Sequence, residues 1–188
     1  MKIIDENTKI ELRTILEKDL FSIWKIAYND NQEWMKYDGP YFEDPIYEEQ
    51  EFVNQIGPKY YLHKDTRLAI IKNSEIVGIV NAHFEDGKLK KWLEFGIVIY
   101  DDNLWGQGVG FETLKLFITY LFDEFKDIRR TGFTTWSGND GMKLGDKLGL
   151  KKEAQIREVR YWDNKYWDSI KYGILRDEWT SIEYKIII

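Results

Sequence analysis

Residues 91–125 read KWLEFGIVIYDDNLWGQGVGFETLKLFITYLFDEF and place an apolar stretch, a glycine-rich turn and an amphipathic stretch in succession. Residues 92–100 are rich in β-branched and aromatic side chains, which predicts a strand. From Phe111 onward, apolar residues recur at spacings of three and four, which predicts a helix that buries one face. The rest of the chain is interpreted around this strand–turn–helix unit.

The turn between the strand and the helix carries Gly106, Gly108 and Gly110 at alternate positions. Such glycines allow a left-handed backbone and a close approach of a ligand to the main chain. Because unpaired N–H groups and the positive end of the helix dipole meet at a helix start, the turn favours an anion such as a pyrophosphate. The alternative is a flexible turn that binds nothing.

Two other phosphate-binding motifs fit this turn poorly. A P-loop needs a Gly-Lys-Ser/Thr ending, whereas the turn ends in Gly110-Phe111. A dinucleotide fold needs an acidic residue on a second strand about 20 residues further on, where this chain is still helical in its pattern.

Length and composition limit the class of protein. A chain of 188 residues, 43% hydrophobic, predicts a single domain over residues 1–188, with residues 180–188 as a C-terminal extension. There is no signal peptide pattern and no membrane-spanning run, so we expect a cytoplasmic protein without a membrane partner. The absence of cysteine excludes thiolate catalysis, and His63 and His83 lack a pattern that predicts a metal site. The net charge of −6 argues against a nucleic-acid partner.

The remaining segments predict a mixed α/β order. Strands are expected at residues 8–15, 67–71, 75–84, 130–136, 151–161 and 165–175, with helices from about residue 17, over 46–56 and over 140–147. Residues 180–188 are interpreted as a tail packed on its own domain, with an added edge strand or a dimer contact as the alternatives, so a monomer and a homodimer both stay open.

The turn resembles the acetyl-CoA loop of the GNAT superfamily of N-acetyltransferases, whose pattern is Arg/Gln-x-x-Gly-x-Gly/Ala. Here Trp105 stands at the first position, and Trp-Gly-x-Gly is typical of the RimJ/RimL-like branch. Residues 137–150, SGNDGMKLGDKLGL, resemble that branch's Asn-rich loop and its Lys-Leu-Gly-Phe helix end, with Leu150 in place of Phe. Residues 173–179, GILRDEW, resemble its closing strand. With Arg13 in the opening strand, the resemblance spans about residues 8–179.

The resemblance implies a GNAT fold, a splayed mixed sheet of about seven strands flanked by about four helices. It also implies an N-acetyltransferase that binds acetyl-CoA, without a metal, and transfers the acetyl group to a primary amine by direct attack. The implied cofactor-binding residues are Ile97, Val98, Ile99, Trp105, Gly106, Gln107, Gly108, Val109, Gly110 and Asn139.

The acceptor site is predicted from the aromatic loop of residues 30–46. The expected substrate-binding residues are Trp34, Tyr37 and Tyr41, with acidic neighbours that attract a protonated amine. The alternative is that these rings only pack against the body of the protein. The expected acceptor is a primary amine, and the N-terminal α-amine of a protein, a polyamine and an aminoglycoside stay open as its identity. A non-catalytic acyl-CoA-binding module is the rival of another class.

The catalytic residue is predicted to be Glu94. An amine must be neutral before it attacks a thioester, so a base must take a proton from it. Glu94 lies in an apolar strand, and the branch often carries a glutamate there, whereas the other interpretation is a solvent-facing strand residue paired with a lysine. The oxyanion donor is implied to be a main-chain N–H around residues 97–99. Gly145 stands where many GNAT members carry the tyrosine that protonates the leaving thiolate, which leaves the general acid open.

Overall fold

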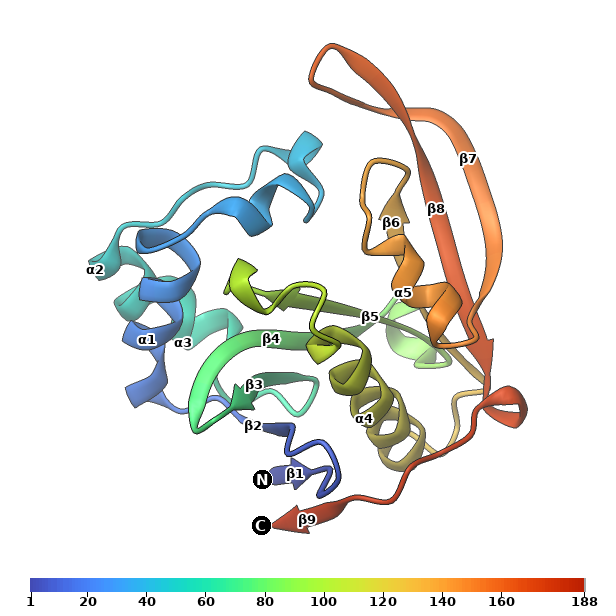
Figure 1. Ribbon diagram of the computed structural model, residues 1–188, viewed down its shortest axis with the longest axis horizontal. Helices are drawn as coiled ribbons and strands as arrows, with labels where there is room; N and C mark the ends of the chain where they lie inside the picture. The colour runs from blue at the N-terminus through green and yellow to red at the C-terminus, as the bar shows by residue number, and fades with distance from the viewer. Residues whose placement is uncertain (188) are drawn as a thin grey trace.

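A nine-stranded mixed sheet forms the centre of the computed structural model, which describes residues 1–187 (Figure 1). The strand order is β7-β8-β6-β5-β4-β3-β2-β1-β9. The strands are β1 (Lys2–Ile4), β2 (Glu11–Thr14), β3 (Arg67–Lys72), β4 (Glu75–Phe84), β5 (Trp92–Ile99), β6 (Arg130–Trp136), β7 (Lys151–Trp162), β8 (Lys165–Leu175) and β9 (Lys185–Ile187).

The expected mixed sheet is confirmed, with nine strands in the described residues rather than about seven. The two additional strands, β1 and β9, have three residues each and pair with one another in antiparallel register at one edge. A three-residue strand is too short to show a period in the sequence, so β1 was missed. Both termini therefore lie on the same side of the molecule (Figure 1). Residue 188, the end of the expected extension, lies outside the described residues.

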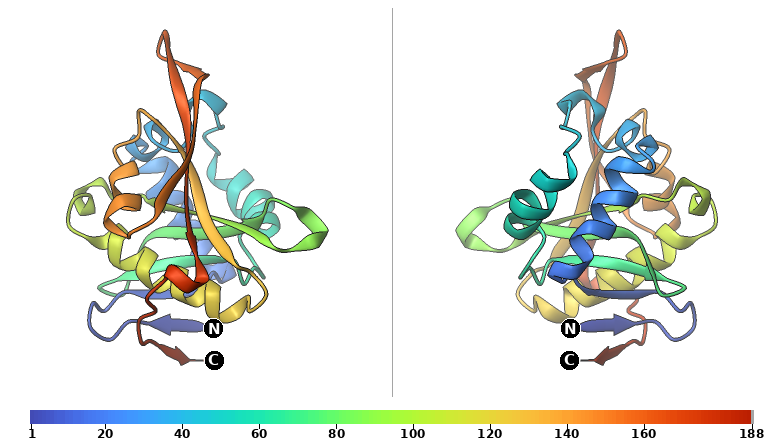
Figure 2. Two further views of the ribbon diagram at one scale, coloured as in Figure 1. Left: turned by 90° about the vertical axis from the view of Figure 1, so that its right-hand side faces the viewer. Right: turned by 90° about the vertical axis from the view of Figure 1, so that its left-hand side faces the viewer.

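Helices cover both faces of the sheet (Figure 2). One face carries α4 (Val109–Glu124) and α5 (Met142–Lys147). The other face carries α1 (Leu20–Trp24), α2 (Glu49–Glu51) and α3 (Gly57–Tyr60). A π-helical turn at Phe52–Ile56 joins α2 to α3, so the two form one helical stretch near the helix expected at 46–56. No helix within residues 1–187 combines the length and the apolar character that a membrane span needs.

Two apolar cores lie on the two faces. Under α4, the buried residues Leu114, Phe117, Ile118 and Leu121 pack on apolar side chains of the sheet. On the opposite face, the second core is rich in aromatic rings, and these buried residues include Tyr28, Trp34, Phe52, Tyr61 and Tyr100. Because successive residues of a strand point to opposite faces, β5 contributes Phe95 and Ile97 to the first core, and Val98 and the adjacent Tyr100 to the second.

The long hairpin of β7 and β8 extends beyond the rest of the molecule in every view (Figures 1 and 2). Its base pairs with β6, and its tip passes beside the loop of residues 37–44. Arg160 on β7 lies over the ring of Tyr41, with its guanidinium carbon 4.8 Å from the ring centroid. The hairpin therefore holds the predicted acceptor loop from one side.

Candidate active site

The glycine-rich turn leads directly into α4. Gly106 and Gly108 have φ angles of 75° and 85°, which residues with a Cβ adopt only with strain. A Cβ on either glycine would meet no heavy atom within 4 Å, so the space in front of the turn is open. Within residues 1–187, the N–H groups of residues 108–111 donate to no other group. They converge with the positive end of a 16-residue helix, an arrangement that suits a phosphate.

Beside the turn, the strands β5 and β6 pair and then part. They are parallel neighbours only from Trp92 to Glu94, opposite Arg130 to Gly132. Beyond Glu94, β5 continues with β4 alone, and β6 continues with β8 alone. The edge of β5 from residue 95 to 99 therefore faces a gap in the sheet.

The main chain of β5 offers hydrogen-bonding groups to this gap. The N–H of Tyr100, directly after β5, donates to the carbonyl oxygen of Val77 on β4 at 2.9 Å. Because main-chain groups alternate in direction along a strand, those of Ile97 and Ile99 point away from β4, into the gap. The Ile99 carbonyl confirms this direction, since it accepts a hydrogen bond from Nε1 of Trp105 at 2.9 Å. Such free N–H and C=O groups suit an extended amide-containing chain such as pantetheine.

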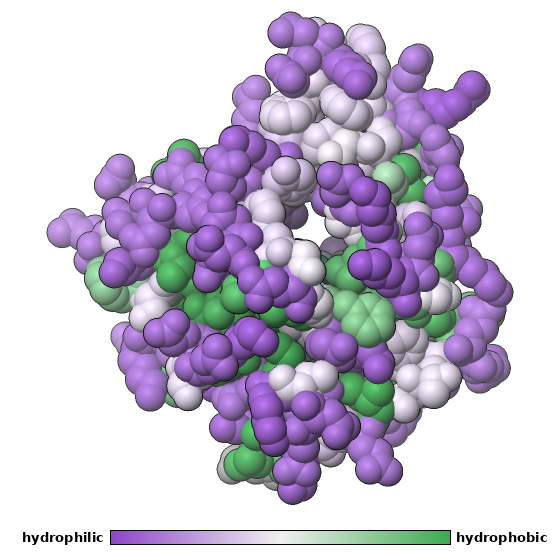
Figure 3. All heavy atoms as spheres, in the orientation of Figure 1, coloured by the Kyte–Doolittle hydropathy of each residue, from purple (hydrophilic) through white to green (hydrophobic). Residues whose placement is uncertain are grey.

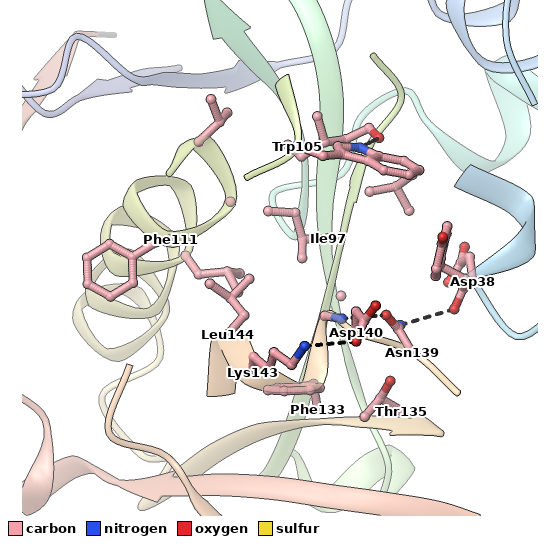
Figure 4. A pocket seen from close by; sticks show the side chains of 18 of the residues that line it. Asp38, Ile97, Trp105, Phe111, Phe133, Thr135, Asn139, Asp140, Lys143 and Leu144 are labelled. Carbon is pink, nitrogen blue, oxygen red and sulfur yellow. Dashed lines mark hydrogen bonds and ion pairs between the residues drawn. The ribbon is translucent and has the colours of Figure 1, made fainter. Parts of the chain in front are cut away.

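A cavity of about 560 Å³ occupies the space between the parted strands, the turn and α5 (Figure 4). The surface of the molecule is hollowed in this region (Figure 3). The predicted residues that line the cavity are Trp34, Tyr37, Ile97, Val98, Ile99, Trp105, Gly106, Gly108, Val109, Gly110 and Asn139. The structure therefore brings together residues from three segments that are far apart in the sequence.

Three predicted residues lie outside the cavity lining. Gln107 donates from Nε2 to the carbonyl oxygen of Asn103 at 2.6 Å and supports the turn from behind. Tyr41 packs edge-on against Trp136, with ring centroids 6.0 Å apart. Glu94 is the third. Their predicted roles in binding and catalysis stay predictions.

Two lysines of the cavity wall were missed from the sequence. Lys143 and Lys147 lie one helical turn apart on α5 and line the cavity, and Lys143 also forms an ion pair with Asp140 at 3.0 Å. Their spacing of four residues in a helix is the signal that would have placed them on one face. They add positive charge beside the N-terminus of α4, which suits an anionic cofactor.

The aromatic loop is attached to the cofactor side of the cavity. The carbonyl oxygen of Tyr37 accepts hydrogen bonds from Nε1 of Trp136 at 3.0 Å and from Nδ2 of Asn139 at 3.1 Å. The ring of Tyr37 packs edge-on against Trp105, with centroids 5.3 Å apart. The loop thus has a defined position opposite the turn.

Trp34 is mainly a core residue. Only 9% of its surface is exposed, and its Nε1 donates to the carbonyl oxygen of Ala27 at 2.7 Å. Its ring also packs edge-on against Tyr100, and one edge of it reaches the cavity. The interpretation as packing therefore holds for most of this side chain, and Tyr37 is the more exposed ring of the wall.

Comparisons with known proteins agree with this geometry. The acetyltransferase (GNAT) domain family matches the chain over residues 9–151. The chain belongs to the GNAT acetyltransferase family. It is therefore an acetyl-CoA-dependent acyltransferase, as the resemblance implied.

Two named relatives of this GNAT protein come from Bacillus subtilis (strain 168). The SPbeta prophage-derived uncharacterized N-acetyltransferase YokL is 24% identical over 112 residues, which cover 59% of this chain and 62% of YokL. The uncharacterized N-acetyltransferase YoaA is 23% identical over 174 residues, which cover 91% of this chain and 96% of YoaA. The chain thus aligns with less than two thirds of YokL but with nearly all of YoaA.

Solved GNAT structures share the fold at low identity. A spermidine N-acetyltransferase from Vibrio cholerae, in complex with CoA and spermine, has a TM-score of 0.70 and 18% identity, with 90% of this chain and 96% of that chain covered. RimL, a ribosomal L7/L12 α-N-protein acetyltransferase in complex with coenzyme A, has a TM-score of 0.71 and 19% identity, with 94% and 99% covered. These two proteins are named for different acceptors, so the likeness supports the fold and leaves the acceptor open.

Glu94 is buried in a network of cations and donors on the face of the sheet opposite α4. Its Oε1 accepts hydrogen bonds from Nη1 of Arg130 at 2.5 Å and from Nε1 of Trp92 at 2.7 Å. Its Oε2 lies 3.4 Å from the hydroxyl of Thr134 and 3.8 Å from Nζ of Lys171. Only 2% of the residue is exposed. The carboxylate is therefore fully engaged, but the alternative of a solvent-facing residue paired with a lysine is wrong in two respects: Glu94 is buried, and Arg130 rather than Lys171 is its main partner.

The position of the usual GNAT tyrosine is filled by packing. A Cβ on Gly145 would lie 2.9 Å from the ring of Tyr172 and 3.1 Å from that of Phe133. These two rings are stacked, with centroids 5.3 Å apart. A tyrosine cannot enter at residue 145 without displacing them, so the proton of the leaving thiolate must come from another source.

A second, smaller cavity of about 220 Å³ lies on the inner side of the aromatic loop. Three carboxylates line it, from Asp38, Glu43 and Asp44. Asp38 and Trp34 line both cavities. Negative charge thus lies on the side of the aromatic loop, while Lys143 and Lys147 place positive charge on the side of the glycine-rich turn. Within residues 1–187, no group of three or more His, Asp and Glu side chains is arranged to hold a metal ion.

Proposed function

We propose that this protein transfers the acetyl group of acetyl-CoA to the α-amino group of a peptide or protein N-terminus, in the manner of the RimJ/RimL-like branch. The parting of β5 and β6 beside the open turn carries the proposal. If acetyl-CoA binds with its phosphates at Gly108 and its pantetheine arm along Ile97 and Ile99, its thioester reaches the acceptor side of the gap. An amine on that side then attacks within a ternary complex.

The proposed reaction needs no covalent enzyme intermediate. The amine nitrogen attacks the thioester carbonyl, and the resulting oxyanion is stabilised by a main-chain N–H of the free β5 edge. The chain has no cysteine to accept the acetyl group, which agrees with direct transfer. Initial-velocity lines that intersect when both substrates are varied are expected for a ternary complex, and parallel lines would contradict it.

A second candidate acceptor is a polyamine. The specific observation in its favour is the smaller cavity, where Asp38, Glu43 and Asp44 offer three carboxylates to a molecule with several cationic groups. The likeness to a spermidine N-acetyltransferase is compatible with this acceptor. Both candidates use the same cofactor site and the same acceptor side.

The test is a panel of amines with acetyl-CoA, in which thiol release and the mass of the acetylated product are both followed. The panel contains peptides of one, three and eight residues with a free N-terminus, the same peptides with an acetylated N-terminus, spermidine and an aminoglycoside. A peptide acceptor is expected to improve with length, because more contacts contribute to binding in the transition state. Faster transfer to spermidine than to every peptide would favour the polyamine, and binding of acetyl-CoA without transfer to any amine would overturn the proposal.

A further inference from the structure

We propose that Asp38 receives the ammonium group of the acceptor and takes the proton that the amine loses before attack; this inference rests on the proposed function. Asp38 lines both the larger cavity and the smaller one. Figure 4 shows it on the wall opposite Phe111 and Leu144, which belong to the cofactor side. The side chain is thus placed where an incoming amine meets the cleft.

The carboxylate of Asp38 has no partner in the described part of the chain. Within residues 1–187, no hydrogen bond or ion pair within 4.0 Å joins it to another side chain. The other carboxylate that lines the larger cavity, Asp140, forms an ion pair with Lys143 at 3.0 Å. Glu94, the residue predicted from the sequence, is bound by Arg130 and Trp92. Of the two carboxylates that line the larger cavity, Asp38 is therefore the one without a partner among the described residues.

The main chain holds Asp38 in place. Its N–H donates to the carbonyl oxygen of Trp34 at 3.2 Å, and the carbonyl just before it, on Tyr37, accepts two hydrogen bonds. Those donors, Trp136 and Asn139, come from the cofactor side of the cavity. Because the main chain already fixes the position of this base, little conformational entropy is lost when the amine binds, which favours proton transfer.

The surroundings of Asp38 make it a stronger base than an ordinary aspartate. The protein atoms around the cavity limit its hydration, although solvent reaches it, and with the nearby Asp44 they raise the pKa of Asp38 to about 6. At pH 7 roughly nine tenths of the molecules still carry the ionised form. The titratable groups around it are Tyr41, Glu43 and Asp44 of its own loop, Tyr100 after β5, and Asp140, Lys143 and Lys147 across the cavity.

The proton balance closes without a separate general acid. Asp38 takes one proton from the ammonium, and the neutral amine forms the C–N bond to the thioester carbonyl. When the C–S bond breaks, the departing thiolate takes the second proton from the nitrogen of the new amide. The products are the amide, the thiol of CoA and one proton on Asp38, which is released to solvent. Gly145 in place of a tyrosine is compatible with this route.

Proton transfer to a carboxylate such as Asp38 is less unfavourable from an α-ammonium than from an alkyl ammonium, because the α-ammonium is the stronger acid. An α-ammonium has a pKa of about 7.7 to 8.0, so its proton moves to a group of pKa about 6 with an equilibrium constant of roughly 1 in 100. An alkyl ammonium such as that of lysine, with a pKa of about 10.4, gives less than about 1 in 10,000. The unfavourable proton transfer from the α-ammonium is readily overcome, because attack on the thioester consumes the neutral amine as it forms.

The test compares wild type, Asp38→Asn, Asp38→Glu and the control Glu33→Gln with the best acceptor of the panel. Glu33 belongs to the same loop and carries the same charge, but it lies outside both cavities. The readouts are the pH profile of kcat/KM and the Kd for acetyl-CoA. Asp38→Asn is expected to lose at least about 100-fold in kcat/KM at pH 7. It is also expected to lose the acidic limb of the profile near pH 6 and to keep its Kd for acetyl-CoA.

Asp38→Glu is expected to recover part of the activity, and Glu33→Gln to match wild type. Because the pKa of Asp38 is raised to about 6 in the folded protein, its charge opposes folding fully above about pH 6 and not at all below about pH 4. Asp38→Asn is therefore expected to be folded and at least as stable as wild type at pH 8. A wild-type pH profile in Asp38→Asn, or an equal loss of acetyl-CoA affinity, would overturn this inference while leaving the proposed function intact. A wild-type protein that binds acetyl-CoA and acetylates no amine would overturn both.

Discussion

Oε1 of Glu94 accepts a hydrogen bond from Nη1 of Arg130 at 2.5 Å, across the only stretch in residues 1–187 where β5 and β6 are paired. The guanidinium of Arg130 also binds the carboxylate of Glu153 on β7. The ion pair therefore joins three strands at the point where the sheet begins to part. Burial opposes the charge of Arg130, but the hydrogen bonds to Glu153 and Glu94 and the charges of these two carboxylates outweigh this effect and raise the pKa of Arg130.

Glu94→Gln is expected to lower the free energy of unfolding by about 2 kcal/mol, because a neutral amide replaces one of the two carboxylates that compensate the mostly buried guanidinium of Arg130, and Glu153 stays as its remaining anionic partner. If Glu94 is also the base predicted from the sequence, kcat falls as well, and the loss shrinks as the pH approaches the pKa of the acceptor. Chemical denaturation and pH-dependent kinetics at a temperature well below unfolding separate the two effects. Normal turnover in a folded Glu94→Gln protein would leave this residue with its structural role alone.

Gly108→Val is expected to weaken acetyl-CoA binding by at least about 10-fold, because a branched side chain at a φ of 85° enters the space in front of the turn. Isothermal titration calorimetry with CoA measures the change. The matched control is Gly87→Val, since Gly87 also has a positive φ of 57° and open space around it but lies outside the cavity. Equal CoA affinities for the two variants would contradict a phosphate site at the turn.

Trp34→Ala is expected to destabilise the protein by roughly 3 to 5 kcal/mol, as large-to-small changes of buried aromatic residues do. Its kinetic effect is therefore a poor test of the acceptor site. Tyr41→Ala leaves the core intact, and we expect it to raise the KM of the acceptor and to spare that of acetyl-CoA. An unchanged KM for the acceptor would assign Tyr41 to packing against Trp136 and Arg160.

The carboxylate of Asp19 is expected to stabilise the fold only at pH values at which it is ionised. Burial opposes its ionisation, but hydrogen bonds from Arg13 and from the N–H of Leu16 outweigh this effect and lower the pKa of Asp19. A carboxyl with a depressed pKa contributes stability above its unfolded value, near 3.9, and loses it as the pH falls through the folded value.

Asp19→Asn should therefore be less stable than wild type at pH 7, with a difference that shrinks below about pH 4. The control is Asp127→Asn, because its carboxylate is exposed and its ion pair with Lys91 contributes little. Unfolding followed by circular dichroism from pH 3 to pH 7 checks both variants. A difference for Asp19→Asn that is constant with pH would contradict the assignment to the ion pair with Arg13.

The sequence by itself determined the class of fold and the cofactor turn. The periods of residues 92–100 and of the helix after Phe111 are properties of short segments, as is the need for glycine where φ is positive. The hairpin of β7 and β8 was predictable for the same reason, since its two strands are adjacent in the chain. Local sequence patterns predict local structure well. The resemblance to the GNAT superfamily then predicted how these strands and helices are arranged in one fold.

The tertiary structure decided what each side chain of the site touches. Glu94 and Arg130 are 36 residues apart, and only the parallel pairing of β5 with β6 brings them together. Asp38 stands in a loop whose position depends on hydrogen bonds from Trp136 and Asn139, about 100 residues further on. Whether a carboxylate is paired or free depends on such long-range contacts, and a linear pattern does not contain them. The sequence shows the charge and the spacing of these residues, whereas their hydrogen-bond and ion-pair partners depend on the packing of the folded chain.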